Sequence, residues 1–367
     1  MDMRRANFSP EGKATATLHQ NSFTRRPASA HGHVRFVIAL VAFFLFAASS
    51  EAETPRNLRL LIVVGESGTE AYESNFDQQV SEWQKLAKEA GVQTTLIGKD
   101  EVGAGASDRD RLRSELETIS GQVETQLWLI LIGHGTYDGR TTKFNLRGDD
   151  ITPDDLQGWL NGLHQEIILI HTGSASGAFI KPLSGRNRIL ITATKSADEY
   201  WATRFGSRFV EALRPDPAGS DQDQDGQVSL LEAWLHAAKS VSISYDEDGR
   251  IATEHSLLDD NGDGVGSRSE TFTQLKPADR ANETNPDGRR AHQTVLLLSP
   301  EEARLTDQQR SQRDEIETQV EALNEKREEL PPEQFYSEIE RLLLQLAAIY
   351  QQSPTVPTTK AVPSKKP

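Results

Sequence analysis

Short apolar runs and amphipathic stretches alternate along the first half of the chain. The apolar runs are rich in β-branched residues, as buried strands are, and we expect strands at 58–64, 92–97, 127–132, 166–171 and 188–194. The stretches between them have helical spacing and predict helices at 74–90, 109–119, 153–163 and 199–213. Strand-helix alternation implies βαβ crossovers, so the predicted fold class is α/β with a parallel sheet flanked by helices on both faces.

The C-terminal part has a different pattern. From Ser299 on, Glu, Gln, Arg and Leu dominate, and two apolar stripes at helical spacing flank Pro331 and Pro332. This pattern predicts a C-terminal helical hairpin with a narrow, coiled-coil-like seam. We expect the hairpin to pack against its partner helix or the main domain, and the alternative is a docking arm for another protein. A further apolar run, 294–298, offers one more strand.

The N-terminus has the pattern of an export signal. An irregular basic segment precedes 13 uncharged apolar residues, 36–48, which are too few to cross a bilayer as a helix. Small residues at Ser50 and Ala52 suit cleavage before Glu53. The chain is therefore expected to be exported, periplasmic or extracellular. If the signal is not cleaved, this segment would be a membrane anchor, and it is the only membrane contact expected.

Composition excludes several kinds of chemistry. The chain has no cysteine, so it has no disulfide, no thiolate metal site and no cysteine nucleophile. Its formal charge of −15 argues against a nucleic-acid partner, which needs a cationic face. We divide the chain into a signal or anchor (1–52), an α/β domain (53–214), a calcium-loop region with a final strand (215–299), the hairpin (300–352) and a disordered tail (353–367).

Two segments match the EF-hand calcium loop, which needs oxygen ligands at positions 1, 3, 5, 7, 9 and 12 and a glycine at position 6. The ligands of the first loop would be Asp221, Asp223, Asp225, the carbonyl of Gln227, Ser229 and Glu232. Those of the second would be Asp259, Asn261, Asp263, the carbonyl of Val265, Ser267 and Glu270. The second departs at position 8, which is a glycine, and no helix is expected after it. We expect Ca²⁺ as the cofactor and a structural clamp rather than a sensor switch.

Polar residues follow two neighbouring strands. His134 and Gly135 come just after the third strand, and Ser174 lies in a small-residue loop after the fourth. The carboxyl ends of parallel strands meet at one sheet edge, so His134 and Ser174 are expected to face each other. His171, at the end of the fourth strand, is a further candidate base, but we expect it simply to be hydrogen-bonded there.

These residues resemble the motifs of the caspase and legumain clan of cysteine peptidases, in which His-Gly follows one strand and the catalytic cysteine lies in a small-residue loop after the next. The resemblance covers residues 58–214 and implies a caspase-like sheet. It places His134 at the catalytic histidine, Gly135 at the oxyanion-binding glycine and Ser174 at the nucleophile. A bacterial group of exported caspase-like proteins with paired calcium loops and a helical C-terminus would resemble the whole mature chain.

The missing cysteine decides between the functional hypotheses. A serine hydroxyl needs an oriented general base, and the sequence shows no acid partner for His134. We therefore expect a pseudo-peptidase that binds a peptide or protein partner without cleaving it. One alternative is a Ser-His peptidase or hydrolase that uses Ser174 and His134, and another is a purely structural remnant.

Overall fold

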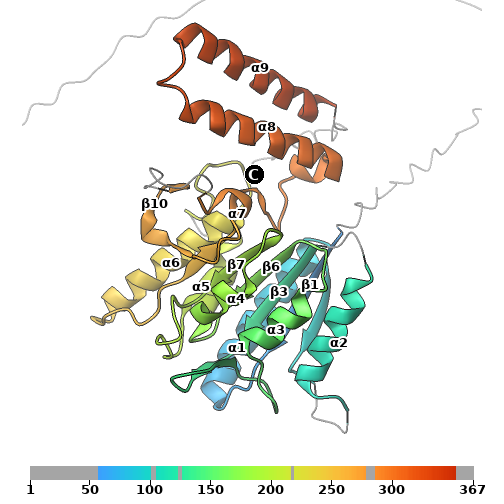
Figure 1. The fold of residues 1–367 in the computed structure, drawn as a ribbon, viewed down its shortest axis with the longest axis vertical. Coiled ribbons are helices and arrows are strands. Elements are labelled where there is room, and N and C mark those ends of the chain that lie inside the picture. The colour runs from blue at the N-terminus through green and yellow to red at the C-terminus, as the bar shows by residue number, and fades with distance from the viewer. Residues whose placement is uncertain (1–56, 101–104, 123–125, 216–218, 278–285, 353–367) are drawn as a thin grey trace, which may run out of the picture. The chain divides into compact units, whose positions relative to one another are not determined.

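The computed structural model describes residues 57–100, 105–122, 126–215, 219–277 and 286–352 (Figure 1). The predicted export signal and the predicted disordered tail lie outside these ranges. The chain divides into two compact units, residues 1–51 and 52–367, and every described residue belongs to the second. Within the described ranges, no helix has the length and apolarity that a membrane crossing requires.

A seven-stranded sheet forms the centre of the described unit, in the order β2-β1-β3-β6-β7-β8-β9. The first five strands are parallel, and β8 and β9 run antiparallel to their neighbours. The strands are β1 (Leu58–Val64), β2 (Gln93–Ile97), β3 (Gln126–Ile132), β6 (Ile167–His171), β7 (Arg188–Thr192), β8 (Leu257–Asp259) and β9 (Ser267–Arg268). The five predicted strands are all present.

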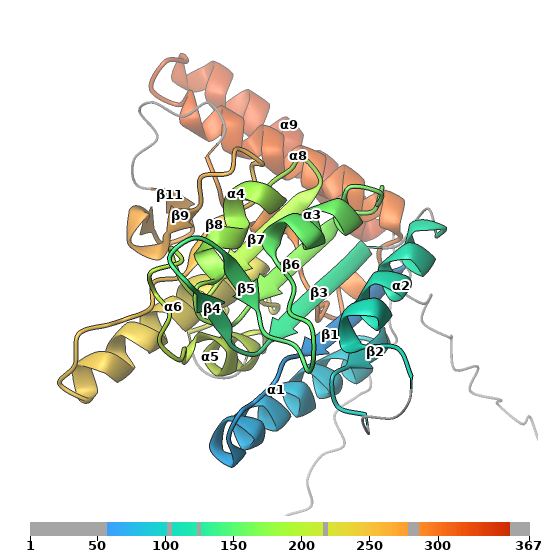
Figure 2. The ribbon, with the colours of Figure 1, turned by 60° about the horizontal axis from the view of Figure 1, so that its bottom comes forward.

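Alternate strand residues point to opposite sides of this sheet, so both of its faces are apolar, and helices cover each face. Leu60 and Ile62 of β1 join one core, to which α1 (Glu70–Glu89), α5 (Phe205–Ala212) and α6 (Leu230–Glu247) contribute. Leu61 and Val63 join the other, with α2 (Asp108–Ser120), α3 (Pro153–Leu160) and α4 (Ile180–Leu183). Figure 2 shows the two layers. The predicted α/β fold with helices on both faces is confirmed.

The predicted helix at 199–213 is only partly formed, since α5 begins at Phe205. The buried carboxylate of Glu199 accepts a hydrogen bond from the Lys195 amide at 2.9 Å and pairs with His255, which keeps this residue in the loop before the helix. Glu254 then accepts the amides of Arg204 and Phe205 at the helix start. Side chains from a distant segment therefore set this boundary.

Short elements surround the sheet. Hairpins are formed by β4 (Gly135–Tyr137) with β5 (Thr142–Phe144) and by β10 (Phe272–Thr273) with β11 (Lys276–Pro277). The 3₁₀ helices are η1 (Ser176–Phe179), η2 (Ser269–Thr271) and η3 (Glu302–Arg304), and α7 spans Arg289–Gln293. The strand expected at 294–298 does not form: this segment instead holds an isolated bridge from Val295 to Ser229.

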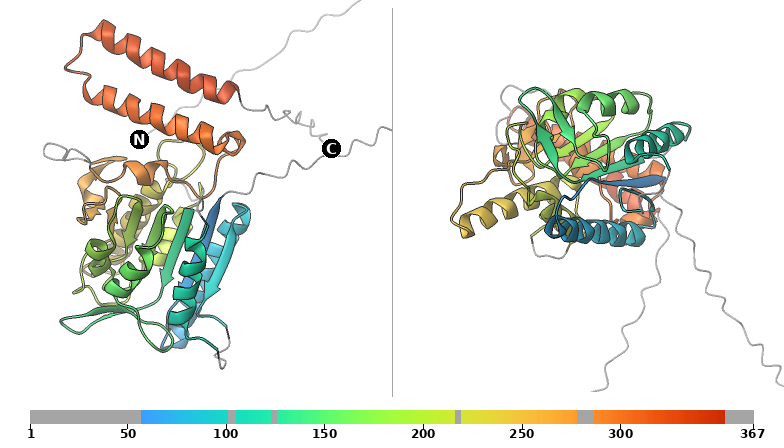
Figure 3. Two further views of the ribbon diagram at one scale, coloured as in Figure 1. Left: turned by 45° about the vertical axis from the view of Figure 1, so that its right-hand side comes forward. Right: turned by 90° about the horizontal axis from the view of Figure 1, so that it is seen from below.

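The C-terminal helices α8 (Asp307–Glu325) and α9 (Pro332–Gln351) form the predicted antiparallel hairpin (Figures 1 and 3). Pro332 is the first residue of α9, a position that tolerates proline because its amide would lack a helical partner. On α8, Arg313 is buried and pairs with Glu302 and Asp314. Tyr350 of α9 donates a hydrogen bond to the same Glu302 carboxylate, so an ion-pair network joins the two helices to η3.

Candidate functional site

The residues of the expected catalytic centre lie at the carboxyl end of β3 and β6. These strands are parallel neighbours, with Leu131 of β3 opposite His171 of β6. His134 follows β3 within two residues, and Ser174 follows β6 within three. The topology therefore brings the two segments to one edge of the sheet, as the sequence predicts.

Ser174 is held by the backbone of Gly135. The Gly135 amide donates to Ser174 Oγ at 3.1 Å, and Oγ donates to the Gly135 carbonyl oxygen at 3.0 Å. A Cβ on Gly135 would lie 2.0 Å from the Ser174 carbonyl oxygen, so only glycine fits here. Ser174 is 3% exposed. The amide that would stabilise an oxyanion thus donates to the serine hydroxyl.

His134 makes different contacts. Its ring packs edge-on against Tyr72, with centroids 4.4 Å apart, and against Phe76 at 5.2 Å. Burial lowers the pKa of His134, and a hydrogen bond to the Ser67 backbone opposes that shift only in part, which keeps the imidazole neutral at pH 7. Of the hydrogen bonds described, none joins His134 to Ser174. The pair is adjacent in the fold, but it is not a formed catalytic dyad.

A cavity of about 260 Å³ opens beside His134. It is lined by α1, the ends of β3 and β6, and the loop before α5, through Ala71, Tyr72, Asn75, Phe76, Gln79, Gly133, His134, Thr172, Ala202 and Thr203. Ser174 is not among these residues. Just before Ala202 in the chain, Tyr200 and Trp201 expose more than half of their surface, and their ring centroids lie 5.5 Å apart.

His171 has a structural position. Its ring is fully buried between Phe144 and Phe179, with centroids 5.2 and 4.7 Å away. Nδ1 accepts the Gly173 amide at 3.1 Å, which fixes the start of the Ser174 loop, and Nε2 has no partner. Burial lowers the pKa of His171 to about 3, so it stays neutral and does not serve as a base near pH 7.

In the first calcium loop, three expected ligands converge. One carboxylate oxygen each from Asp221, Asp223 and Asp225 lies within 4.8 Å of the others. Gly226 has φ +86°, the left-handed turn that position 6 demands. Asp221 Oδ1 is buried without a hydrogen-bond partner, which costs free energy unless a cation occupies the site. The arrangement fits a hard, oxygen-ligated cation.

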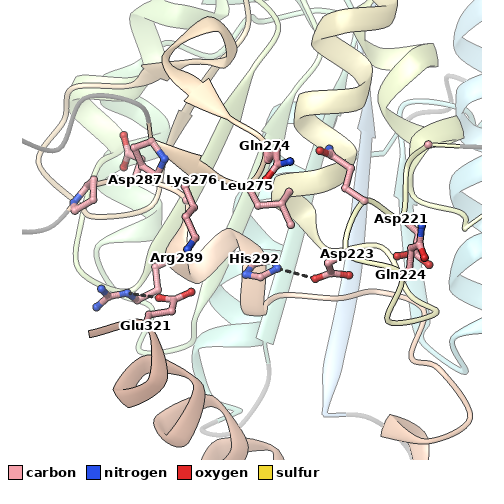
Figure 4. A pocket seen from close by; sticks show the side chains of 15 residues that line it. Asp221, Asp223, Gln224, Gln274, Leu275, Lys276, Asp287, Arg289, His292 and Glu321 are labelled. Carbon is pink, nitrogen blue, oxygen red and sulfur yellow. Dashed lines mark hydrogen bonds and ion pairs between the residues drawn. The ribbon is translucent and has the colours of Figure 1, made fainter. Parts of the chain in front are cut away.

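The other expected ligands of this loop surround the same turn. Glu232 is buried and accepts hydrogen bonds from the amide and hydroxyl of Ser229, forming a capping box at the start of α6. Gln227 is buried, and its side chain accepts the Ser299 amide at 3.2 Å. Nε2 of His292, on α7, lies 3.1 Å from Oδ2 of Asp223, and both residues line a cavity of about 580 Å³ (Figure 4). Arg289, in the same cavity, pairs with Glu321 of α8 at 3.5 Å.

The second loop brings together only part of its expected ligands. Asp259 is buried and accepts the amides of Gly262 and Gly264 at 3.0 and 3.2 Å. Asn261 donates from its side chain to Asp263 at 3.2 Å. Asp259, Asn261 and Asp263 thus line one turn, and Val265, the expected carbonyl ligand, has an exposed side chain.

The last two expected ligands of the second loop, Ser267 and Glu270, have different partners and do not converge. Ser267 donates to Asp287, a residue outside the predicted motif, at 2.7 Å. Glu270 instead exposes 62% of its side chain and pairs with Arg268 at 3.0 Å. Glu270 lies inside the three-residue η2, which β10 follows directly, so no α-helix starts here to turn it inward. The motif spacing gave no signal for Asp287, because it lies 17 residues after position 12.

The two predicted calcium loops lie at one end of the sheet, and His134, Ser174 and the cavity beside His134, together called the cleft, lie at the other end. Strand β8 runs antiparallel to β7, with Asp259 opposite Leu190 and Leu257 opposite Thr192, so the loop after Asp259 lies at the amino end of β7. Helix α7 lies at this end too, since Arg290 donates to the carbonyls of Arg186 and Arg188. His134 and Ser174 lie at the carboxyl ends. A cation in either loop would therefore stand apart from His134 and Ser174.

Comparisons with known proteins give weak likenesses. No protein-family model matches the chain, and no curated protein matches it. Among solved structures, it is similar to caspase-1 from Spodoptera frugiperda (9% identity, TM-score 0.36, 56% of this chain and 86% of that one). It is similar to the Drosophila initiator caspase Dronc (11%, 0.36, 57% and 81%) and to a protein from Geobacter sulfurreducens (9%, 0.36, 55% and 92%).

Proposed function

We propose that this chain is an exported, calcium-binding pseudo-peptidase whose cleft binds a peptide or protein segment without cleaving it. One observation carries the proposal. The Ser174 hydroxyl exchanges two hydrogen bonds with the Gly135 backbone, and His134 is not its partner. A serine nucleophile needs a base within hydrogen-bond reach, commonly oriented by a third group, and an amide free to receive the oxyanion.

Binding is supported by the cavity beside His134. Its wall combines aromatic rings, from Tyr72 and Phe76, with the side-chain amides of Asn75 and Gln79. Ligand sites are commonly concave and apolar with a few convergent polar groups. Tyr200 and Trp201, which precede Ala202 of this wall in the chain, expose their rings, and tyrosine and tryptophan are enriched where proteins recognise one another.

Calcium has a stabilising role in this proposal. The unpartnered Asp221 oxygen and the converging carboxylates of the first loop support a cation there. Because the loops lie at the amino end of the sheet, a cation there would order the structure rather than contact a peptide in the cleft. Exported proteins meet abundant calcium, which suits loops of modest affinity.

The alternative is a Ser-His hydrolase, which the neutral imidazole of His134 favours because only the neutral ring can take a proton. The test compares purified wild type with Ser174→Ala and Ser174→Cys on a broad peptide library, with calcium and with EDTA. We expect wild type and Ser174→Ala to be equally inactive and to retain the same peptides. Cleavage by wild type that Ser174→Ala abolishes would establish the hydrolase. Cleavage by Ser174→Cys alone would mark a scaffold that has lost its nucleophile.

A further inference from the structure

The first calcium loop shows how its closing carboxylate is held. Glu232 Oε1 accepts the amides of Gln222 and Asp223, at loop positions 2 and 3, at 2.7 and 3.4 Å. Glu232 Oε2 accepts the hydroxyl of Ser229, at position 9, at 2.8 Å. One carboxylate thus bridges the start and the end of the loop, as expected of the residue at position 12.

Asp287 makes the same contacts in the second loop. Its Oδ1 accepts the amides of Asp260 and Asn261, again at positions 2 and 3, at 2.9 and 3.2 Å. Its Oδ2 accepts the hydroxyl of Ser267, at position 9, at 2.7 Å. Glu270, the residue at position 12, pairs with Arg268 at the surface. The three contacts of Asp287 therefore correspond to three of those of Glu232, which in addition accepts the Ser229 amide.

An independent observation is that three buried carboxylates lie here without a described ion-pair partner. Asp259, Asp260 and Asp287 are each only 1–2% exposed. Of the lysines, arginines and histidines described, none forms an ion pair with any of the three carboxylates. Arg290, on the adjoining helix, donates to the Asp260 carbonyl and pairs with Glu166 instead. Buried carboxylates without a cation are costly, and a divalent ion would offset that cost.

The second loop also contacts α7, through Asp260 at loop position 2. The Asp260 carboxylate accepts the amides of Gly288 and Ala291 at 2.9 and 2.7 Å, which fixes the first turn of that helix next to Asp287. Two residues farther along the chain than Ala291, Gln293 donates to the Asp314 carbonyl of α8 at 3.1 Å. Contacts thus lead from the second loop through α7 to the C-terminal hairpin.

We propose that Asp287, and not Glu270, supplies the carboxylate that closes the second calcium site. The inference rests on the proposed calcium binding. A cation held by Asp259, Asn261, Asp263 and Asp287 ties the turn after β8 to α7. The second site would then link two distant segments of the chain, and we call it a long-range staple. In the first loop, by contrast, all ligands come from one continuous segment.

The test counts calcium sites by isothermal titration of the metal-stripped full chain. We expect two sites in wild type. In Asp287→Asn the site of the second loop should bind calcium at least about tenfold more weakly, because a carboxylate ligand is lost, so that one site of wild-type affinity remains. The matched control, Glu270→Gln, keeps both sites at wild-type affinity. Glu232→Gln should lose the site of the first loop, which identifies the part of the titration curve that comes from that loop.

Outcomes separate this inference from the proposal on which it rests. Two intact sites in Asp287→Asn, or a site lost in Glu270→Gln, would overturn the role of Asp287. A single wild-type site that Glu232→Gln removes would overturn the second site and leave the first. A wild-type chain that binds no calcium would overturn both.

A second measurement needs no substitution at Asp287. Amide hydrogen exchange of wild type and Glu270→Gln, with and without calcium, reports on α7. We expect calcium to slow exchange at Gly288 and Ala291 at least about tenfold in both proteins, because the ion holds Asp287 and the helix start in place. Equal exchange rates with and without calcium would overturn the staple, even if the first loop binds the ion.

Discussion

The two ends of the sheet treat their polar groups in opposite ways. At the carboxyl end, Ser174 and Gly135 satisfy each other with two hydrogen bonds, and His134 is a neutral ring among aromatic ones. At the amino end, Asp287 and its neighbours bring buried carboxyl groups together without a described ion-pair partner. Groups that are already hydrogen-bonded need no ligand, whereas buried carboxylates that lie close together would be stabilised by a cation. The residues that resemble a catalytic motif are thus hydrogen-bonded within the chain, and the carboxylates at the amino end are the groups that a ligand would stabilise.

Calcium should have the largest effect on stability. At free calcium 100-fold above the dissociation constant, each site adds about 2.7 kcal/mol to the free energy of unfolding, so two sites add roughly 5 kcal/mol. Denaturant unfolding in calcium and in EDTA measures this difference. Glu232→Gln, which disables the first loop only, should keep about half of the gain. Equal unfolding curves in the two buffers would remove the contrast between the ends.

Acid should weaken the carboxyl end through His171. Its pKa is about 3 in the folded chain against an ordinary value of 6.5, so protonation favours the unfolded state. The contribution to stability is complete above pH 6.5 and is lost as the pH falls toward 3, at up to about 1.4 kcal/mol per pH unit. Between pH 6.5 and 4.5 the loss from this residue should reach about 2.3 kcal/mol, less than two full units of slope because the unfolded histidine is already half protonated at pH 6.5.

The measurement compares unfolding free energies at pH 7 and 4.5, in EDTA, for wild type and His171→Asn. The asparagine Oδ1 takes the place of the Nδ1 that accepts the Gly173 amide, and asparagine does not titrate in this range. The variant should therefore lose less stability on acidification than wild type, and the difference isolates His171 from the carboxylates that titrate in both proteins. Parallel losses in the two proteins would show that the buried ring does not control the acid response.

Gly135→Ala should break the close contact that satisfies Ser174. The new Cβ would meet the Ser174 carbonyl oxygen at 2.0 Å, and backbone must move to relieve the clash. We expect a loss of about 2 kcal/mol, within the range found for overpacked interiors. Gly158→Ala in α3 is the matched control, since its Cβ meets nothing within 4 Å and alanine favours a helix. Equal stability of the two variants, read from thermal unfolding, would contradict the steric account.

The sequence predicted best what depends on neighbouring residues. The strands are visible as apolar runs because β1, β3, β6 and β7 are buried on both faces. The convergence of Asp221, Asp223 and Asp225 could be predicted because these residues lie in one segment. Long-range partners could not be predicted: His255 keeps Glu199 out of α5, and Asp287 takes the contacts expected for Glu270. The bonds between Ser174 and Gly135 also cross 39 residues, and no local pattern encodes them.

The smallest effect is expected for Ser174→Ala. The change removes the two hydrogen bonds with Gly135 and leaves a buried amide and carbonyl without that partner, so about 1 to 2 kcal/mol of stability should be lost. Calcium affinity should not change, because the loops lie at the other end of the sheet. Thermal unfolding and calcium titration of the same samples check both statements. Weaker calcium binding in Ser174→Ala would mean that the two ends are energetically coupled, and the cleft would then be regulated by the metal rather than merely supported by it.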